Sequence, residues 1–213
     1  MTPAEASFKM HSLCSQAPVV PVLVIDDLAH AVPLARALIA GGLSVLEVTL
    51  RTPVALAAIA AMATVPGATV GAGTLITASD VSAAKAAGAE FGVSPGATPA
   101  LLDACEAADL PLLPGAASIT EVMTLLARGY SVQKFFPAEA NGGVAALSAI
   151  SGPLPQVQFC PTGGVNTHNA PEYLALKNVI CVGGSWVAPS ALLARGDWQG
   201  ITALARAASR LQS

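Results

Sequence analysis

Short runs of β-branched and other apolar residues alternate along the chain with longer alanine-rich runs. The apolar runs have the length of buried strands, and the alanine-rich runs have the length and composition of helices. This alternation predicts parallel strands joined by crossover helices. The expected strands cover residues 19–25, 45–51, 69–75, 90–95, 111–116, 132–138, 157–164 and 179–186.

These eight units begin about 20 to 26 residues apart, which favours a closed (β/α)8 TIM barrel over an open sheet. Residues 3–16, within the N-terminal segment 1–18, predict an extra helix that closes one end of the barrel. No linker or low-complexity tract divides the sequence. We therefore expect residues 1–213 to form one α/β barrel domain.

Local signals mark where several helices begin. Thr52-Pro53 and Thr98-Pro99 each combine a helix-capping residue with a proline suited to the first helical position. Residues 77–80 and 118–121 have the pattern of capping boxes, the first with Asp in place of Glu. Pro33 falls inside the helical run 28–40, so that helix either starts late or has irregular first turns.

The composition suits a large core and argues against two classes of partner. Of the 213 residues, 54% are hydrophobic and 11% are charged, and the formal net charge is −3. This chain lacks a basic cluster that would bind nucleic acid or an anionic membrane surface.

Two charge-free stretches, between Arg51 and Asp80 and between Glu139 and Glu172, are long enough to span a bilayer. Prolines and glycines interrupt both stretches, and the first residues lack the apolar core of a secretory signal. We therefore expect a soluble, cytoplasmic protein. The four cysteines have neither CxxC spacing nor a histidine at metal-ligand spacing, so they are interpreted as structural thiols in a reducing compartment.

The strand at residues 45–51 carries polar side chains on one face only. Alternation places Glu47, Thr49 and Arg51 on the face that points into the barrel. The positions between them are apolar and face the helices. Glu47 and Arg51 lie roughly 13 Å apart along the strand, so they cannot pair directly. Arg51 is expected at the mouth of the barrel and Glu47 deeper.

Lys134 lies in the middle of the short apolar strand 132–138. Burial disfavours the charged ammonium and favours the neutral amine, which can attack a carbonyl carbon. The lysine is expected at the depth of Glu47 on a different wall. One alternative is a Lys134–Glu47 ion pair without chemistry, although apolar packing would stabilise a barrel interior better.

Glycines gather at three of the expected strand ends. Residues 70–74 (Val-Gly-Ala-Gly-Thr) lack the spacing of a dinucleotide fingerprint. Their glycines either let a ligand approach backbone N–H groups or are barrel-corner glycines without a ligand. Residues 160–164 and 182–185 end the seventh and eighth strands with glycine pairs, where barrels often bind phosphate. Residues 189–193 suit the short helix that follows such a site. His30, near a helix start, is interpreted as a surface or capping residue.

Six motifs occur in order at the strand ends: Leu-Glu-Val-Thr-Leu-Arg-Thr (46–52), Val-Gly-Ala-Gly-Thr (70–74), Ser-Pro-Gly (94–96), Lys-Phe-Phe-Pro-Ala-Glu (134–139), Cys-Pro-Thr-Gly-Gly (160–164) and Gly-Gly-Ser-Trp (183–186). With them the chain closely resembles the bacterial 2-dehydro-3-deoxy-6-phosphogluconate (KDPG) aldolases, also described as 4-hydroxy-2-oxoglutarate (KHG) aldolases. The resemblance runs from about residue 19 to the C-terminus.

The resemblance implies a class I aldolase that works without a metal or other cofactor. In this family, Lys134 matches the Schiff-base lysine and Glu47 the general acid/base. Arg51 and Thr74 match residues that hold the pyruvyl carboxylate. The other matches line the pyruvyl pocket (Pro95, Phe136 and Thr162) or bind phosphate (Gly163, Gly164, Gly184 and Ser185). The resemblance also implies a homotrimer.

The implied reaction cleaves KDPG to pyruvate and glyceraldehyde 3-phosphate, a step of the Entner–Doudoroff pathway. The nearest alternatives use the same lysine on 4-hydroxy-2-oxoglutarate or on the galactonate epimer of KDPG. A phosphate-binding isomerase that uses Glu47 without a covalent step is a different class, and a non-catalytic barrel that assembles as a ring is another. Neither of these two requires an inward-facing lysine nucleophile.

Overall fold

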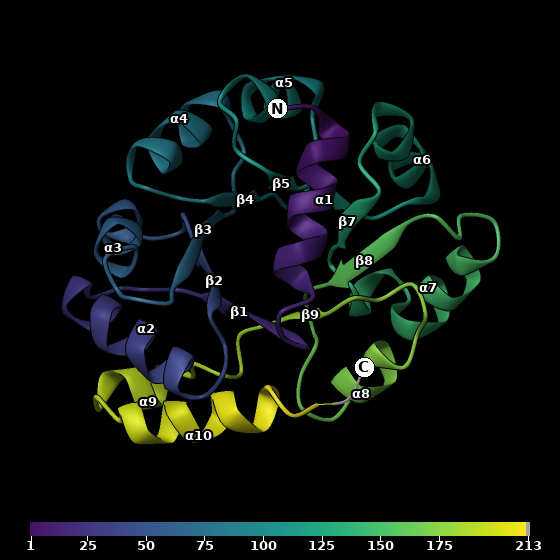
Figure 1. Cartoon of the computed structure of the whole chain (residues 1–213). Helices are drawn as coiled ribbons and strands as arrows, with labels where there is room; N and C mark the ends of the chain where they lie inside the picture. Colours follow the sequence, from purple (N-terminus) through teal and green to yellow (C-terminus); the bar gives the residue numbers. More distant parts are fainter. Residues whose placement is uncertain (212–213) are drawn as a thin grey trace.

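The computed structural model describes residues 1–211 and shows an α/β fold built on curled parallel sheets (Figure 1). The strands are β1 Val19–Leu23, β2 Val45–Thr49, β3 Thr69–Gly73, β4 Phe91–Val93, β5 Leu112–Leu113, β6 Gly115–Ala116, β7 Val132–Phe135, β8 Gln158–Pro161 and β9 Val182–Gly184. The α-helices are α1 Pro3–Cys14, α2 Ala31–Ala40, α3 Ala55–Met62, α4 Ala78–Ala86, α5 Pro99–Ala107, α6 Ile119–Arg128, α7 Gly143–Ser151, α8 Ala170–Leu174, α9 Ser190–Ala194 and α10 Trp198–Ala208. Two 3-10 turns, η1 Leu28–His30 and η2 Glu139–Asn141, complete the elements.

The strands form two sheets whose neighbours run parallel. One sheet has the order β5-β4-β3-β2-β1-β9, and the other has the order β6-β7-β8. Single bridges between Phe159 and Val179 and between Thr162 and Gly183 connect the region of β8 with that of β9. In Figure 1 the strands surround the centre of the molecule, helices α2 to α10 lie outside them, and α1 crosses the middle of the view.

Each predicted strand run contains an observed strand, but the run at residues 111–116 is split. Leu112–Leu113 pairs with β4, whereas Gly115–Ala116 pairs with β7. Pro114 stands between the two pieces and has no N–H to donate to a strand ladder. Its carbonyl oxygen still accepts a hydrogen bond of 2.9 Å from the backbone N–H of Lys134.

Most of the predicted helix starts are confirmed. Thr98 caps α5, and capping boxes begin α4 at Thr77 and α6 at Ser118. The irregular first turn expected around Pro33 is the 3-10 turn η1, which leads directly into α2.

The prediction that Thr52 caps a helix is wrong. The α3 helix begins at Ala55 after Val54, which makes no side-chain capping bond. The hydroxyl of Thr52 instead donates a hydrogen bond of 2.6 Å to the carbonyl oxygen of Ile25. Thr52 therefore contacts the end of a neighbouring strand instead of capping α3.

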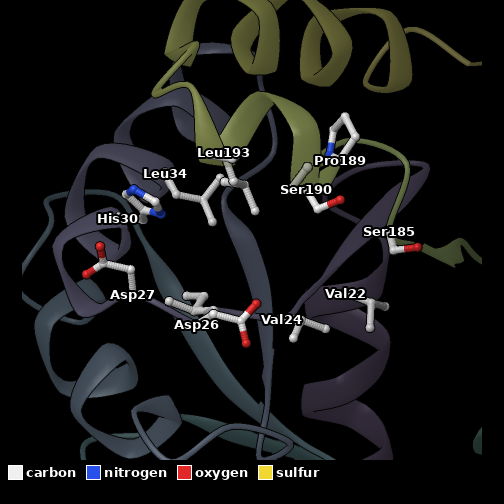
Figure 2. Close-up of a pocket in the computed structure, with 13 residues that line it drawn as sticks. Val22, Val24, Asp26, Asp27, His30, Leu34, Ser185, Pro189, Ser190 and Leu193 are labelled. Atoms are coloured by element: carbon white, nitrogen blue, oxygen red, sulfur yellow. The ribbon is translucent and has the colours of Figure 1, made fainter.

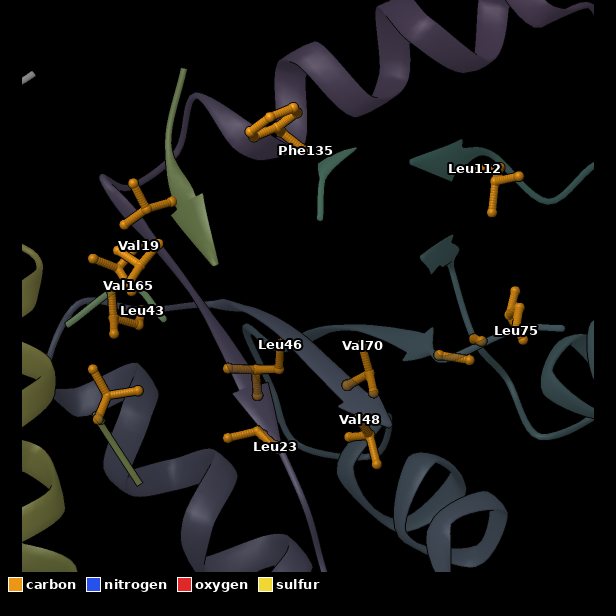
Figure 3. Packing of buried hydrophobic residues seen from close by; sticks show 14 of the residues in the cluster. Val19, Leu23, Leu43, Leu46, Val48, Val70, Leu75, Leu112, Phe135 and Val165 are labelled. Atoms are coloured by element: carbon orange, nitrogen blue, oxygen red, sulfur yellow. The ribbon is translucent and has the colours of Figure 1, made fainter. Parts of the chain in front are cut away.

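The apolar core has an outer and an inner part. Figure 3 shows side chains of the outer part, among them Leu46, Val48 and Val70, which are fully buried. The inner part unites two residues of α1, Met10 and Cys14, with strand residues of both sheets. Those strand residues include Val20, Val45, Phe91, Val93, Leu113, Val132 and Cys160, and they are joined by Cys181 just before β9. Helix α1 contacts β5 and β7, so it packs against the interior at one end.

All four cysteines are buried and free. Burial raises the pKa of the Cys105 thiol to about 12. Hydrogen bonding with the thiols of Cys14 and Cys160, together with burial, raises the pKa of Cys181 well above its ordinary value. These two thiols therefore stay protonated and unreactive, as expected for packing residues. Within residues 1–211, none of the helices is long and apolar enough to cross a membrane.

Candidate active site

A cavity of about 160 Å³ lies where several strands end. Its lining combines the seven residues predicted for catalysis and pyruvyl binding with two others. The full set is Val22, Glu47, Thr49, Arg51, Thr74, Pro95, Lys134, Phe136 and Thr162. These residues lie in or just after β1, β2, β3, β4, β7 and β8. The structure thus brings together residues that are spread over most of the chain.

Lys134 and Glu47 face each other across this cavity. Lys134 lies on β7 in the smaller sheet, and Glu47 lies on β2 in the larger sheet. The Lys134 Nζ atom is 3.6 Å from Glu47 Oε1, and the two residues are only 5% and 3% exposed. Glu47 Oε1 has no hydrogen-bond partner in the described structure. A buried, unsatisfied carboxylate oxygen beside an amine is costly for stability, which indicates a chemical role.

The ring of Phe136 forms another side of the lysine environment. Lys134 Nζ lies 5.0 Å from the centroid of this ring. An aromatic face at that distance attracts a cation. Phe136 therefore presents an aromatic face that can stabilise a cationic group formed at this position, without supplying a hydrogen-bond acceptor.

Arg51 and Thr74 lie nearer the solvent. Arg51 is exposed, and its guanidinium makes no ion pair or hydrogen bond with the residues that the structure describes. Thr74 has a backbone φ of 63°, which is unusual for a β-branched residue. Such strained conformations cluster at functional sites. A free guanidinium beside a hydroxyl suits the recognition of a carboxylate.

Thr49 and Val22 line the cavity but were not among the predicted site residues. The Thr49 hydroxyl donates a hydrogen bond of 2.8 Å to the carbonyl oxygen of Leu23. Its proton is therefore held by the backbone of β1. The inward face of the strand at 45–51 already pointed to Thr49, whereas no sequence signal singled out Val22.

The glycines of β3 lie beside bulky side chains of the protein. A Cβ atom at Gly71 would collide with the ring of Phe91, and one at Gly73 would collide with the side chain of Glu47. The space beside each glycine is thus filled by a protein side chain. In the same way, a Cβ at Gly183 would lie 3.0 Å from Cγ2 of Thr162 and closer to its hydroxyl.

The four predicted phosphate-binding residues do not share the cavity of Lys134. Gly163 and Gly164 follow β8 with φ values of 97° and 82°, which only glycine adopts readily. Gly184 is buried, and a Cβ there would collide with the ring of Trp186. Ser185 is exposed and lines a separate, larger cavity.

This second cavity has a volume of about 470 Å³ and shares Val22 with the first. Figure 2 shows Asp26 and Asp27 on the side opposite Ser190, with His30 near Leu34 and Asp27 at one end. His30 is half-buried, and its ring packs edge-on against Trp198 with centroids 5.5 Å apart. The sequence indicated one wall of this cavity, through Ser185 and residues 189–193, but gave no signal for the opposite wall at residues 22–34.

Glu139 borders the Gly163–Gly164 turn. Its backbone N–H donates to the carbonyl oxygen of Gly163 at 3.1 Å, and its carboxylate accepts a hydrogen bond from the hydroxyl of Tyr173. Burial and this contact raise the pKa of Tyr173. Glu139 is therefore anchored to α8, and its charge is held away from the Lys134 cavity.

Comparison with known proteins identifies the family. The profile described as KDPG and KHG aldolase matches residues 10–204. The 2-dehydro-3-deoxy-phosphogluconate aldolase of Pseudoalteromonas atlantica is 57% identical over 195 residues, which cover 91% of each chain. The KHG/KDPG aldolase of Escherichia coli K12 is 52% identical over 198 residues, which cover 92% of this chain and 93% of that protein.

Solved structures agree. The 2-keto-3-deoxy-6-phosphogluconate aldolase of Zymomonas mobilis with 3-phosphoglycerate has a TM-score of 0.92 at 50% identity, covering 97% of each chain. The KDPG aldolase of Legionella pneumophila, with pyruvate captured as a covalent carbinolamine, has a TM-score of 0.91 at 51% identity. This match covers 93% of our chain and 97% of the other. The chain therefore belongs to the KDPG and KHG aldolase family.

Proposed function

We propose that this protein is a Schiff-base aldolase that cleaves KDPG to pyruvate and glyceraldehyde 3-phosphate. The observation that carries the proposal is the buried Lys134 amine, 3.6 Å from the unsatisfied Glu47 carboxylate in a small cavity. A cavity of about 160 Å³ suits the pyruvyl part of a substrate rather than the whole molecule.

The reaction begins with the neutral amine of Lys134. Its nitrogen adds to the C2 carbonyl carbon of the substrate, and the carbonyl oxygen takes up a proton to give a carbinolamine. Loss of this hydroxyl group as water leaves a protonated imine. Glu47 lies where it can carry both protons, directly or through a water molecule.

The protonated imine then accepts the electron pair of the broken carbon–carbon bond. The C4 hydroxyl loses its proton, the C3–C4 bond breaks, and glyceraldehyde 3-phosphate leaves as an aldehyde. The enamine that remains takes a proton at C3, and water hydrolyses the imine to release pyruvate and the free lysine. The Phe136 ring, 5.0 Å from Nζ, stabilises the cationic stage.

Arg51 and Thr74 hold the substrate carboxylate at the outer end of the cavity. The guanidinium offers a planar pair of N–H donors, and it is free of protein partners within the described residues. Pro95, Phe136 and Thr162 enclose the three-carbon unit. Fixing the carboxylate orients the C2 carbonyl towards Lys134.

The distal phosphate binds at Gly163, Gly164, Gly184 and Ser185. Support comes from the positive φ angles of Gly163 and Gly164 and from the position of Ser185 on the neighbouring cavity. The Zymomonas mobilis relative was solved with 3-phosphoglycerate, a phosphorylated carboxylate. A remote phosphate anchor would position the reacting carbons.

The larger assembly is also proposed. In this proposal the described residues 1–211 form one closed eight-stranded barrel domain. Two observations support it: β5 and β6 follow each other directly, and bridges connect β8 to the β9 region. Helix α1 closes one end, where Met10 and Cys14 join the inner core. The barrel assembles as a cytoplasmic homotrimer. The trimer is proposed from membership of the family alone.

An alternative substrate is KHG, because the Escherichia coli relative is named KHG/KDPG aldolase. The galactonate epimer of KDPG would use the same lysine chemistry. Steady-state kinetics with the three substrates side by side separates these alternatives. We expect a higher kcat/KM for KDPG than for KHG, because only a phosphorylated substrate reaches the glycines that follow β8 and β9. The epimer carries the same phosphate, so its rate relative to KDPG reports how the pocket contacts the hydroxyl groups.

Borohydride trapping with pyruvate tests the mechanism. We expect one pyruvyl group per chain, located at Lys134 by peptide mass mapping. Lys134→Arg should fold but give no adduct, since a guanidinium stays protonated and forms no imine. Glu47→Gln should label more slowly, with cleavage reduced about 10²–10⁴-fold.

Lys85→Arg is the matched control. Lys85 Nζ donates to the carbonyl oxygen of Asp109 on the surface, far from the cavity lining, so this variant should label normally. An adduct on Lys85 or Lys177 would overturn the assignment of the nucleophile. The absence of an adduct in the wild-type protein would favour an isomerase without a covalent step.

A further inference from the structure

We propose that Gly73 is a positioning residue for the reaction: its missing side chain makes the space that holds the Glu47 carboxylate beside Lys134. This inference rests on the proposed role of Glu47 as the proton carrier. It concerns a glycine that neither touches the reacting atoms nor lines the cavity.

The placement of Gly73 follows from the strand register. In the β2–β3 pair, Glu47 lies opposite Gly71, and Thr49 lies opposite Gly73. The side chain of Glu47 leans along its strand, as side chains on sheets do, and reaches the level of Gly73. A Cβ atom at Gly73 would lie 2.7 Å from Cγ and 2.8 Å from Cδ of Glu47, and closer still to Oε1.

Backbone conformation does not explain this glycine. Gly73 is absent from the residues with positive φ, so alanine could adopt its conformation. All three of the nearest atoms that a Cβ would meet belong to Glu47. The requirement for glycine at this position therefore comes from the Glu47 side chain.

The space available to Glu47 is closed on its other side. Glu47 is 3% exposed, and Lys134 Nζ stands 3.6 Å from Oε1. Interiors are packed densely enough that one added methyl group moves its neighbours. A methyl group at position 73 would therefore displace the carboxylate from its place between β3 and Lys134.

Gly71 provides a matched control in the same strand. It lies two residues away on the same face, but the three nearest atoms that a Cβ there would meet all belong to the ring of Phe91. Gly71→Ala therefore adds the same methyl group to the same strand, with a cost set mainly by Phe91.

The test is a double-mutant cycle between positions 73 and 47. We expect Gly73→Ala to reduce kcat for cleavage, and the rate of pyruvate trapping, towards the level of Glu47→Gln, about 10²–10⁴-fold. It should also lower the melting temperature by about 3–10 °C. In a Glu47→Ala background, which leaves room for the methyl group, Gly73→Ala should change kcat by less than about twofold and should not lower the melting temperature.

A Glu47→Gln background distinguishes an effect of side-chain volume at position 47 from an effect of its charge. Glutamine has the shape of glutamate, so Gly73→Ala should still lower the melting temperature there. Gly71→Ala should lower the melting temperature equally in the Glu47 and Glu47→Ala backgrounds. If Gly73→Ala alone fails to fold, the double variant with Glu47→Ala should still fold, and its failure to fold would overturn the inference.

Two further outcomes are informative. If Gly73→Ala keeps wild-type kcat while Glu47→Gln loses activity, the inference about Gly73 is wrong and the proposed function stands. If Gly73→Ala has the same effect in both backgrounds, the glycine acts through the backbone, and the inference is also overturned. Full activity in Glu47→Gln would instead contradict the proposed role of Glu47.

Discussion

At the scale of single residues, the site depends on polar groups without a hydrogen bond to the protein. Glu47 Oε1 is buried without a hydrogen bond although it lies 3.6 Å from Lys134 Nζ, and the exposed Arg51 guanidinium has no partner among the described residues. The buried oxygen of Glu47 costs stability, whereas Arg51 is solvated and available to a ligand. Glu47 is suited to transferring a proton during the reaction, and Arg51 is suited to binding the substrate carboxylate.

Arg51→Lys tests the second assignment. An ammonium group cannot supply the planar pair of donors, so we expect kcat/KM for KDPG to fall by about 1–3 kcal/mol of transition-state binding. The adduct with pyruvate should still form at Lys134, although only at a higher pyruvate concentration. An unchanged kcat/KM would remove Arg51 from the carboxylate site.

At the scale of elements, function gathers where the strands end, and local signals define where the helices begin. The capping box of α6 is an example: the Glu121 carboxylate accepts hydrogen bonds of 2.8 and 2.9 Å from the N–H groups of Ala117 and Ser118. The bond from Ala117 is the largest cause of a Glu121 pKa below its ordinary value of 4.5.

This shift predicts a pH-dependent contribution to stability. Because the folded-state pKa is lowered, ionised Glu121 stabilises the fold at pH values above 4.5, and the effect disappears as the pH falls through the lowered pKa. Glu121→Gln should therefore reduce the free energy of unfolding by about 0.5–1 kcal/mol at pH 7. Urea unfolding at several pH values should show this difference shrinking below pH about 4. A constant difference would mean that the charge contributes nothing.

The strand ends after β8 and β9 carry the proposed phosphate site. Ser185→Ala should lower kcat/KM for phosphorylated KDPG more than for KHG, because only the first substrate carries a phosphate. We expect a loss of about 1–2 kcal/mol for KDPG, typical of a hydrogen bond to a charged group. Ser190→Ala, which changes another serine on the 470 Å³ cavity, is the control. Equal losses on both substrates would indicate a misplaced phosphate site.

At the scale of the whole molecule, the N-terminal helix α1 packs against the inner core formed by the strands. Met10 is 1% exposed within the inner core, whereas Phe8 on the same helix is 78% exposed. Met10→Ala should lower the free energy of unfolding by about 2–5 kcal/mol, and Phe8→Ala should change it by less than about 0.5 kcal/mol. Chemical denaturation of both variants measures the difference. Similar values would contradict the packing of α1 against the inner core.

The sequence by itself determined the features that depend on neighbouring positions in the chain. Period-two alternation placed Glu47, Thr49 and Arg51 on one face, and the cavity lining confirms that placement. The caps at Thr77, Thr98 and Ser118 form within four residues, so local pattern was sufficient. The six motifs likewise identified the family.

Only the tertiary structure decided contacts between distant segments. Thr52 has the sequence pattern of a helix cap, but its hydroxyl donates a hydrogen bond to the carbonyl oxygen of Ile25 at the end of the neighbouring strand. Gly73 resembles a ligand-binding glycine, yet its free space is occupied by Glu47 from β2. Lys134 and Glu47 lie 3.6 Å apart although they belong to different sheets. The 470 Å³ cavity is likewise lined by residues near β1 and by residues of α9. Such contacts arise from strand register and close packing, which a linear pattern does not encode.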